Sequence, residues 1–153
     1  MRVLHVDDNP DDRGLVARAL LAHDKHLEIV QVGDPDALTA ALAERPDFVI
    51  TDYELRFSDG LALLRQVKAL WPEVPVIMYT GTGSEEVAVL AMKAGLEDYV
   101  LKKAGEMPRL VNAVKRALQP AGQRRAAEEA EARYRSLYEG VPVGLFRASA
   151  QGQ

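Results

Sequence analysis

The chain has 153 residues, of which 48% are apolar and 27% charged, with a net charge of −4, which suits one ordinary globular domain with a modest extension. Cysteine is absent, which excludes disulfides, thiolate catalysis and cysteine-ligated metals, and the acidic balance disfavours a nucleic-acid partner. No apolar run approaches the roughly 20 residues that span a bilayer, and no signal-peptide pattern is present, so we expect a cytoplasmic protein without a membrane partner.

Short apolar runs alternate with stretches of helical period through residue 119. The runs predict five strands, at 3–6, 27–32, 48–51, 76–80 and 99–101. Three of them (3–6, 48–51 and 76–80) are apolar on consecutive residues, which is typical of strands covered on both faces. Polar residues interrupt the run at 27–32, so we expect that strand near the edge of a sheet.

The stretches between these runs predict helices with one apolar face each. The face-forming residues are Leu15, Val16, Ala19 and Leu20; Leu63, Leu64, Val67 and Leu70; Val87, Leu90, Ala91 and Ala94; and Leu110, Val111, Val114 and Leu118. Asp34 and Asp59 stand where they cap the helices that follow, and Gly95 stands where a helix ends. Alternating strands and helices predict an α/β fold, a doubly wound parallel sheet with helices on both faces.

Polar residues stand at the carboxyl ends of four of the predicted strands. They are Asp7 and Asp8 after the first, Asp52 after the third, Thr80 at the end of the fourth and Lys102 after the fifth. Ligands bind at this edge of a parallel sheet, so we expect these side chains to lie close together. We interpret the neighbouring Asp11 and Asp12 as caps of the next helix.

These residue types favour phosphoryl chemistry. Three carboxylates in one crevice repel each other strongly, and a hard divalent cation such as Mg²⁺ relieves that repulsion. The hydroxyl of Thr80 can donate to a phosphoryl oxygen, and the small Gly81 leaves room beside it. Beside three acids, the ammonium of Lys102 becomes a fixed counter-charge for a phosphoryl group.

Several short motifs stand at fixed points along residues 1–119. They are Asp7-Asp8, Asp52 after the run 48–51, Asp59-Gly60, Thr80-Gly81, Lys93-Ala94-Gly95 and the run 98–102. Together they make the chain similar to a response-regulator receiver domain of two-component signalling. The resemblance implies a flavodoxin-like sheet with strand order 2-1-3-4-5. It implies a sensor histidine kinase or phosphotransfer protein as partner, and no enzymatic turnover beyond the domain's own phosphorylation and dephosphorylation.

The resemblance implies a metal-assisted phosphoryl transfer. Asp52 attacks the phosphorus of a kinase phosphohistidine and then holds an aspartyl phosphate. Asp8 and Asp52 ligate Mg²⁺, Asp7 does so directly or through water, and the backbone carbonyl of Glu54 is a further ligand. The expected contribution of the protein is positioning and charge neutralisation.

The resemblance also implies a switch, with two departures from the family pattern. Lys102 and Thr80 bind phosphoryl oxygens, Thr80 moves toward the phosphoryl group, and Tyr99 turns into the vacated space. The face of the fourth helix, fifth strand and fifth helix then changes, which controls downstream domains. Lys103 follows Lys102 where the family usually has Pro, often with a cis bond, so we expect a trans bond and a differently shaped loop there. Arg56 stands where Pro is common, which we interpret as loosening the loop after Asp52.

The composition changes after residue 119. Residues 120–140 are rich in Ala, Arg and Glu, with opposite charges four apart, and predict a linker helix. Its apolar residues, which follow a 3-4-3 spacing, are Ala127, Ala130, Tyr134 and Leu137. A solvated linker and a dimerising coiled coil both stay open. Residues 141–153 are interpreted as the truncated start of a PAS sensor domain, with output domains beyond this chain.

Two other classes of function compete with a receiver. A haloacid-type phosphatase also uses Asp and Mg²⁺, but it places a second acid two residues after its nucleophile, where this chain has Asn9. A receiver-shaped docking or dimerising module that is not phosphorylated is disfavoured by the complete five-residue site. His5 is interpreted as a packed core residue, and His23 and His26 as solvated residues, since no zinc-binding spacing is present.

Overall fold

The computed structural model describes residues 1–119. The expectations for the linker helix at 120–140, its dimerisation and the PAS start at 141–153 lie outside the described residues. The elements are β1 (Arg2–Val6), α1 (Pro10–His23), β2 (Glu28–Val32), α2 (Pro35–Ala41), β3 (Phe48–Thr51), β4 (Glu54–Leu55), β5 (Ser58–Asp59), α3 (Gly60–Leu70), β6 (Val76–Thr80), α4 (Glu85–Lys93), β7 (Asp98–Leu101) and α5 (Met107–Ala117). Within residues 1–119, no helix is both long and apolar enough to cross a bilayer.

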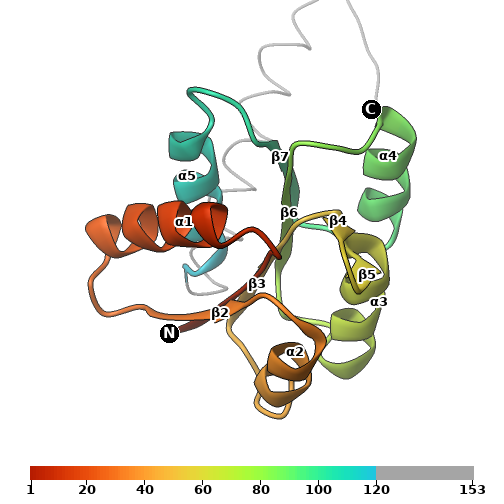
Figure 1. The fold of residues 1–153 in the computed structure, drawn as a ribbon, viewed down its shortest axis with the longest axis horizontal. Helices are drawn as coiled ribbons and strands as arrows, with labels where there is room; N and C mark the ends of the chain where they lie inside the picture. The colour runs from red at the N-terminus through yellow and green to blue at the C-terminus, as the bar shows by residue number, and fades with distance from the viewer. Residues whose placement is uncertain (120–153) are drawn as a thin grey trace, which may run out of the picture. The chain divides into compact units, whose positions relative to one another are not determined.

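Five strands form one parallel sheet in the order β2-β1-β3-β6-β7 (Figure 1). This confirms the predicted strand order, and β2 lies at an edge as its polar residues indicated. The three strands with consecutive apolar residues, β1, β3 and β6, occupy the centre of the sheet. Their side chains are buried on both faces, which explains why their sequences show no alternation of polar and apolar residues.

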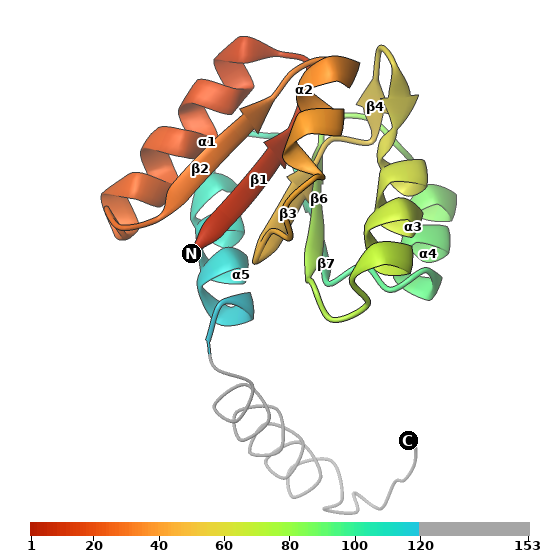
Figure 2. The same ribbon diagram turned by 90° about the horizontal axis from the view of Figure 1, so that it is seen from below.

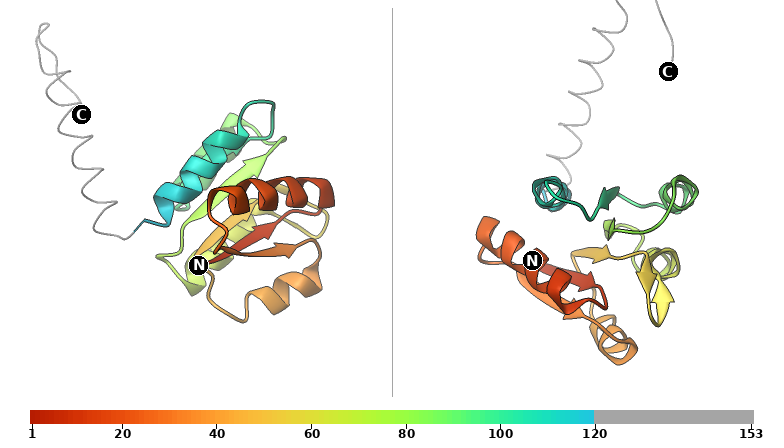
Figure 3. Two further views of the ribbon diagram at one scale, coloured as in Figure 1. Left: turned by 90° about the vertical axis from the view of Figure 1, so that its left-hand side faces the viewer. Right: turned by 45° about the horizontal axis from the view of Figure 1, so that its top comes forward.

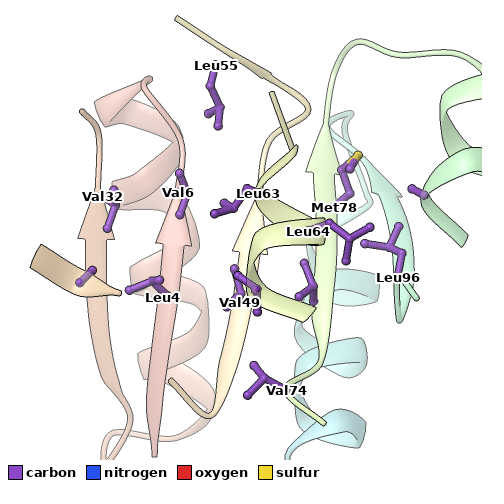
Figure 4. Packing of buried hydrophobic residues seen from close by; sticks show 14 residues of the cluster. Leu4, Val6, Val32, Val49, Leu55, Leu63, Leu64, Val74, Met78 and Leu96 are labelled. Atoms are coloured by element: carbon purple, nitrogen blue, oxygen red, sulfur yellow. The ribbon is translucent and has the colours of Figure 1, made fainter. Parts of the chain in front are cut away.

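The helices cover the sheet on both faces, with α1 and α5 on one side and α2, α3 and α4 on the other (Figures 2 and 3). Two cores result. One lies between the sheet and α2, α3 and α4 and contains Leu4, Leu64 and Met78 (Figure 4). The other lies between the sheet and α1 and α5 and contains Val3 and Ile50. Side chains alternate between faces along a strand, so odd-numbered residues of β1 face α1 and α5.

The helix caps agree with the sequence at two positions and differ at one. The side chains of Asp34 and Asp59 cap α2 and α3, as predicted. At α1 the cap is Asn9, whose side-chain oxygen accepts from the backbone N–H groups of Asp11 and Asp12. The interpretation of Asp11 and Asp12 as caps was therefore wrong, because Asn9 already fills that role and leaves both carboxylates free for other contacts.

Three apolar residues that the helical period placed on buried faces are exposed. Leu15, Leu70 and Leu90 retain 47%, 52% and 48% of their accessible surface. A helix that lies on a sheet buries a narrower stripe than the one that its apolar residues outline, so the outer residue of each stripe faces solvent. The antiparallel pair β4–β5 was also not predicted, because strands of two residues are too short to show a period.

Candidate functional site

The Lys102 ammonium lies among three carboxylates at the carboxyl edge of the sheet. Its Nζ is 2.7 Å from Asp7 Oδ2, 2.8 Å from Asp52 Oδ2 and 2.8 Å from Asp12 Oδ2. Asp7 follows β1, Asp52 follows β3, Lys102 follows β7 and Asp12 lies in the first turn of α1. The sheet therefore brings together residues that are up to 95 positions apart in the sequence.

Backbone hydrogen bonds hold three of these residues at the strand ends. The N–H of Asp7 donates to Val32 O at 2.9 Å and that of Asp52 donates to Val6 O at 3.0 Å. In the same way the N–H of Lys102 donates to Thr80 O at 2.9 Å. Each bond extends a parallel ladder by one residue beyond its strand. The positions of the three side chains are therefore fixed by the rigid sheet.

Burial and pairing act in opposite directions on the charges of the site. Burial alone would lower the pKa of Lys102, but hydrogen bonds from its ammonium to Asp12, Asp52 and Asp7 outweigh it and raise that pKa above its ordinary value. For Asp7, burial raises the pKa, although Lys102 and the N–H of Asn9 counteract it. The lysine is the cation on which the ionised state of Asp7 depends.

Asp7 is held from several directions, and a buried histidine lies beside it. Its Oδ1 accepts from the N–H of Asn9 at 2.9 Å, and its backbone oxygen accepts from Arg13 Nη1 at 2.6 Å. His5 is fully buried, as predicted, and its Nε2 lies 3.9 Å from Asp7 Oδ2. Neither ring nitrogen of His5 has a hydrogen-bond partner among residues 1–119. Burial, followed by the charges of Lys102 and Arg13, lowers the pKa of His5 to about 4.

The depressed pKa of His5 predicts a specific acid sensitivity. Its pKa in the folded state lies below the ordinary value of 6.5, so proton uptake favours the unfolded chain and stability falls as pH drops from 6.5 toward 4. We expect His5 to contribute a loss of about 2–3 kcal/mol in the free energy of unfolding between about pH 7.5 and pH 4.5. Urea unfolding of His5→Leu should show this loss reduced, whereas the exposed-residue control His23→Leu should retain it. Equal pH dependence in the natural chain and His5→Leu would contradict the assignment.

Asp8 joins the site to the loop after β3. Its Oδ2 accepts from the backbone N–H of Arg56 at 2.8 Å, and the Arg56 Nε lies 3.8 Å from the same oxygen. A proline at this position would have no N–H to donate. The expectation that Arg56 loosens this loop was therefore wrong, because its N–H ties the loop to Asp8.

Thr80 and Tyr99 are linked through Thr82. Thr80 Oγ1 accepts from the N–H of Thr82 at 3.1 Å, and the Tyr99 hydroxyl donates to Thr82 O at 3.2 Å. Burial, and then the negative charge of Asp52, raises the pKa of Tyr99, so its hydroxyl keeps the proton that it donates. A Cβ added at Gly81 would meet Lys102 Cβ at an ordinary 3.7 Å, so packing alone does not require glycine there.

The donor set at this edge suits a hard divalent cation. Asp7 Oδ2 and Asp52 Oδ2 both lie within 2.8 Å of Lys102 Nζ, so the two oxygens face the same small space. Carboxylate oxygens are ligands that Mg²⁺ prefers. Glu54, whose backbone carbonyl was the fourth predicted ligand, lies on β4 with an exposed side chain. Within residues 1–119, no group of three or more acidic or histidine side chains is placed to hold a metal ion, and the Lys102 ammonium lies between the Asp7 and Asp52 carboxylates.

The structure brings together Asp7, Asp52 and Lys102 as predicted and adds two residues that sequence reasoning missed. Asp12 gives the lysine a third carboxylate. The aromatic ring of Tyr79 lies below the ammonium, with Nζ 5.8 Å from its centroid. The signal for Asp12 was its place in the first turn of the helix that directly follows Asp7 and Asp8, at the same edge of the sheet.

Comparison with known proteins gives a consistent set of relatives. The sequence model of the response regulator receiver domain matches residues 3–115. The nitrogen assimilation regulatory protein NtrX of Azorhizobium caulinodans is 41% identical over 130 residues, which are 83% of this chain and 28% of that protein. The DNA-binding transcriptional regulator NtrC of Salmonella typhimurium is 34% identical over 113 residues, 74% of this chain and 24% of that protein. The chain thus spans about a quarter of the length of these two relatives.

Solved structures of similar proteins share the fold. The receiver domain of NtrX from Brucella abortus is 38% identical and superposes with a TM-score of 0.67, covering 78% of this chain and 99% of that one. A CheY-like receiver domain protein from Methanospirillum hungatei is 25% identical, with a TM-score of 0.68, and covers 76% of this chain and 92% of that one. The five-stranded parallel sheet with flanking helices is common to them.

Proposed function

The chain belongs to the response regulator receiver domain family, and from this premise we propose that Asp52 accepts a phosphoryl group from the phosphohistidine of a sensor histidine kinase or phosphotransfer protein. The observation that carries the proposal is the position of the Asp52 carboxylate. It lies at the end of a central strand, with its side chain 12% exposed, beside Asp7 and 2.8 Å from the Lys102 ammonium. A nucleophile for phosphoryl transfer needs this combination of fixed position and nearby positive charge.

In the proposed transfer an Asp52 carboxylate oxygen forms a bond to phosphorus while the bond from phosphorus to the donor nitrogen breaks. Tyr53 N–H donates to Asp52 Oδ1 at 2.7 Å and Lys102 to Oδ2 at 2.8 Å, so both oxygens are oriented before the donor arrives. Asp7, Asp8, Asp52 and the Glu54 carbonyl would hold Mg²⁺. When bound, the metal supplies positive charge among the acids and the phosphoryl oxygens.

The proposed binding of the phosphoryl group uses Lys102 and Thr80. The ammonium exchanges a carboxylate partner for a phosphoryl oxygen, and the Thr80 hydroxyl turns from Thr82 to another phosphoryl oxygen. Only hydroxyl rotation and a small side-chain movement are required, since both groups already lie at the carboxyl edge of the sheet. The reaction repeats only after the aspartyl phosphate is hydrolysed, so the domain acts as a signalling element in the cytoplasm and not as an enzyme for a small substrate.

The proposed output begins at Thr82, which contacts both Thr80 and Tyr99. When Thr80 turns toward the phosphoryl group, Thr82 loses that contact, and the loop at 81–84 and the Tyr99 ring rearrange together. Their movement changes the face formed by α4, β7 and α5, on which Leu90 and Met92 are 48% and 46% exposed. Phosphorylation would shift a two-state equilibrium of this face and thereby control output domains or a second copy of the chain.

Intact-protein mass spectrometry after incubation with acetyl phosphate tests the proposed chemistry. The chain should gain one phosphoryl mass increment in the presence of Mg²⁺ and lose the gain when EDTA is added first. The absence of an increment from a folded protein that binds Mg²⁺ would favour the docking-module alternative. An increment of equal size in EDTA would contradict the role of the metal.

Replacing Asp12 with asparagine should accelerate phosphorylation. The substitution removes one of the negative charges that would repel the incoming anion. It also removes one of the three carboxylates that hold Lys102. We expect the initial rate with acetyl phosphate to rise about fivefold, the effect of roughly 1 kcal/mol at a site with partial solvent screening. Asp11→Asn is the matched control, because Asp11 lies on the same helical turn and its side chain is exposed. A rate unchanged in Asp12→Asn, or raised equally in both variants, would contradict this prediction.

A further inference from the structure

His5 is a buried polar residue whose ring makes no hydrogen bond within the described part of the chain. Its side chain has no accessible surface, and within residues 1–119 neither ring nitrogen makes a hydrogen bond. A neutral imidazole carries one N–H, and a buried donor without an acceptor lowers stability. The register pairs His5 with Ile50 of β3, and Val3 precedes it on the same face, so an apolar residue would suit this layer better.

An acceptor close to His5 is the oxygen that Lys102 now holds. Asp7 Oδ1 is bound by the N–H of Asn9, whereas Asp7 Oδ2 accepts from Lys102 Nζ at 2.7 Å. His5 Nε2 lies 3.9 Å from that same oxygen. A movement of about 1 Å would bring the pair to hydrogen-bond distance.

Phosphorylation creates the need for this bond. If the ammonium turns toward a phosphoryl group on Asp52, Asp7 Oδ2 loses its hydrogen bond from Lys102 in a fully buried position. A metal held by Asp7 would balance the charge of the carboxylate but would supply no hydrogen-bond donor to orient it. The Arg13 guanidinium, the other nearby donor, already holds the backbone oxygen of Asp7. The Arg13 guanidinium also has little room to move, because it packs closely against the backbone of Gly33. A Cβ added at Gly33 would overlap the guanidinium.

We propose that His5 is a positioning residue that donates its Nε2–H to Asp7 Oδ2 when Lys102 moves to the phosphoryl group. The inference rests on the proposed function and adds to it a replacement donor that keeps the Asp7 carboxylate oriented in the phosphorylated state. An outer-shell partner of this kind fixes a ligating carboxylate. The unpaired N–H in the resting state and the new bond in the phosphorylated state both bias the domain toward phosphorylation.

The test compares His5→Leu and His5→Gln with the natural chain. His5→Leu removes the unpaired donor, so the melting temperature of the resting protein should rise by about 3–6 °C. The same variant should bind beryllium trifluoride, a phosphoryl mimic, about tenfold more weakly in Mg²⁺, as measured from amide NMR signals. The glutamine amide of His5→Gln supplies an N–H at similar reach and should restore binding to within about threefold of the natural chain.

A purely structural role would not give opposite signs for stability and binding. The control His23→Leu removes an exposed histidine and should change neither. If the natural chain and His5→Leu bind beryllium trifluoride equally, the positioning role is overturned while the proposed function stands. If the natural chain does not bind it at all, the proposed function fails, and the inference fails with it.

Ring nitrogen NMR of the natural chain gives a reading that does not depend on any substitution. We expect the His5 proton on Nε2 in both states. Its chemical shift should change to a value typical of a strong hydrogen bond when beryllium trifluoride and Mg²⁺ are added. A proton on Nδ1 in the bound state would overturn the proposal, because the nitrogen that faces Asp7 would then have nothing to donate.

Discussion

Replacing Lys102 with alanine is expected to lower the free energy of unfolding by about 3–5 kcal/mol at neutral pH, the usual effect of removing one partner of a buried ion pair. The substitution leaves three carboxylates around a space with no cation. The side chain of Asp7 has no accessible surface and that of Asp52 has 12%, so water replaces the ammonium poorly. Urea unfolding of the natural chain and the variant measures this difference.

The deficit of Lys102→Ala should depend on pH in a defined direction. Burial already raises the pKa of Asp7 above its ordinary 3.8, and loss of the lysine raises it further. An acid whose pKa is higher in the folded state favours folding at low pH, and this contribution is lost as pH rises above the pKa of the unfolded chain. The deficit should therefore be small near about pH 4 and grow toward about pH 7.

Lys103→Ala is the control for this experiment. Lys103 is the neighbouring residue, it is exposed, and its backbone N–H donates to Leu101 O at 3.1 Å. We expect a change within about 0.5 kcal/mol at every pH. A deficit in Lys102→Ala that is independent of pH would contradict the view that the lysine acts by compensating buried carboxylates.

Replacing Gly60 with alanine is expected to damage both stability and phosphorylation. A Cβ at Gly60 would overlap the backbone oxygen of Asp52 and lie 3.0 Å from Tyr53 Cα. Neither backbone atom can turn aside, so the end of β3 and the start of α3 must move apart. We expect a loss of roughly 2–3 kcal/mol in the free energy of unfolding, and up to about a hundredfold slower phosphorylation because the nucleophile is displaced.

Gly14→Ala is the matched control for Gly60→Ala. Gly14 lies inside α1, and a Cβ there would meet nothing closer than Arg18 Nη1 at 3.9 Å. The exchange should stabilise the domain by about 0.5–1 kcal/mol, because alanine favours helix formation. Normal phosphorylation of Gly60→Ala would contradict the account, as would equal stability changes in the two variants.

The fold was predictable because its signals are local. The consecutive apolar residues of β1, β3 and β6 indicated strands covered on both faces, and strict alternation with helices left a parallel sheet as the arrangement. The site followed from the topology, because the residues after parallel strands share one edge. Asp7, Asp52 and Lys102 were placed together in this way before any distance was known.

The missed features depend on packing that a single stretch of sequence does not record. Asp12 resembles any acid in the first turn of a helix, and its contact with Lys102 depends on how α1 lies against the sheet. The Arg56 tie to Asp8 is a backbone bond, which the identity of the side chain does not reveal. Gly60 belonged to a recognised motif, but the reason for glycine there is its contact with the backbone of Asp52, which only the folded chain shows.

A comparison of intact masses tests whether Asp52 is the phosphoacceptor. The natural chain, Asp52→Asn and Asp12→Asn are incubated with acetyl phosphate and Mg²⁺ under the same conditions. We predict a phosphoryl mass increment in the natural chain and in Asp12→Asn, and none in Asp52→Asn, with all three proteins folded. An increment that persists in Asp52→Asn would contradict the account, because another residue would then be the acceptor.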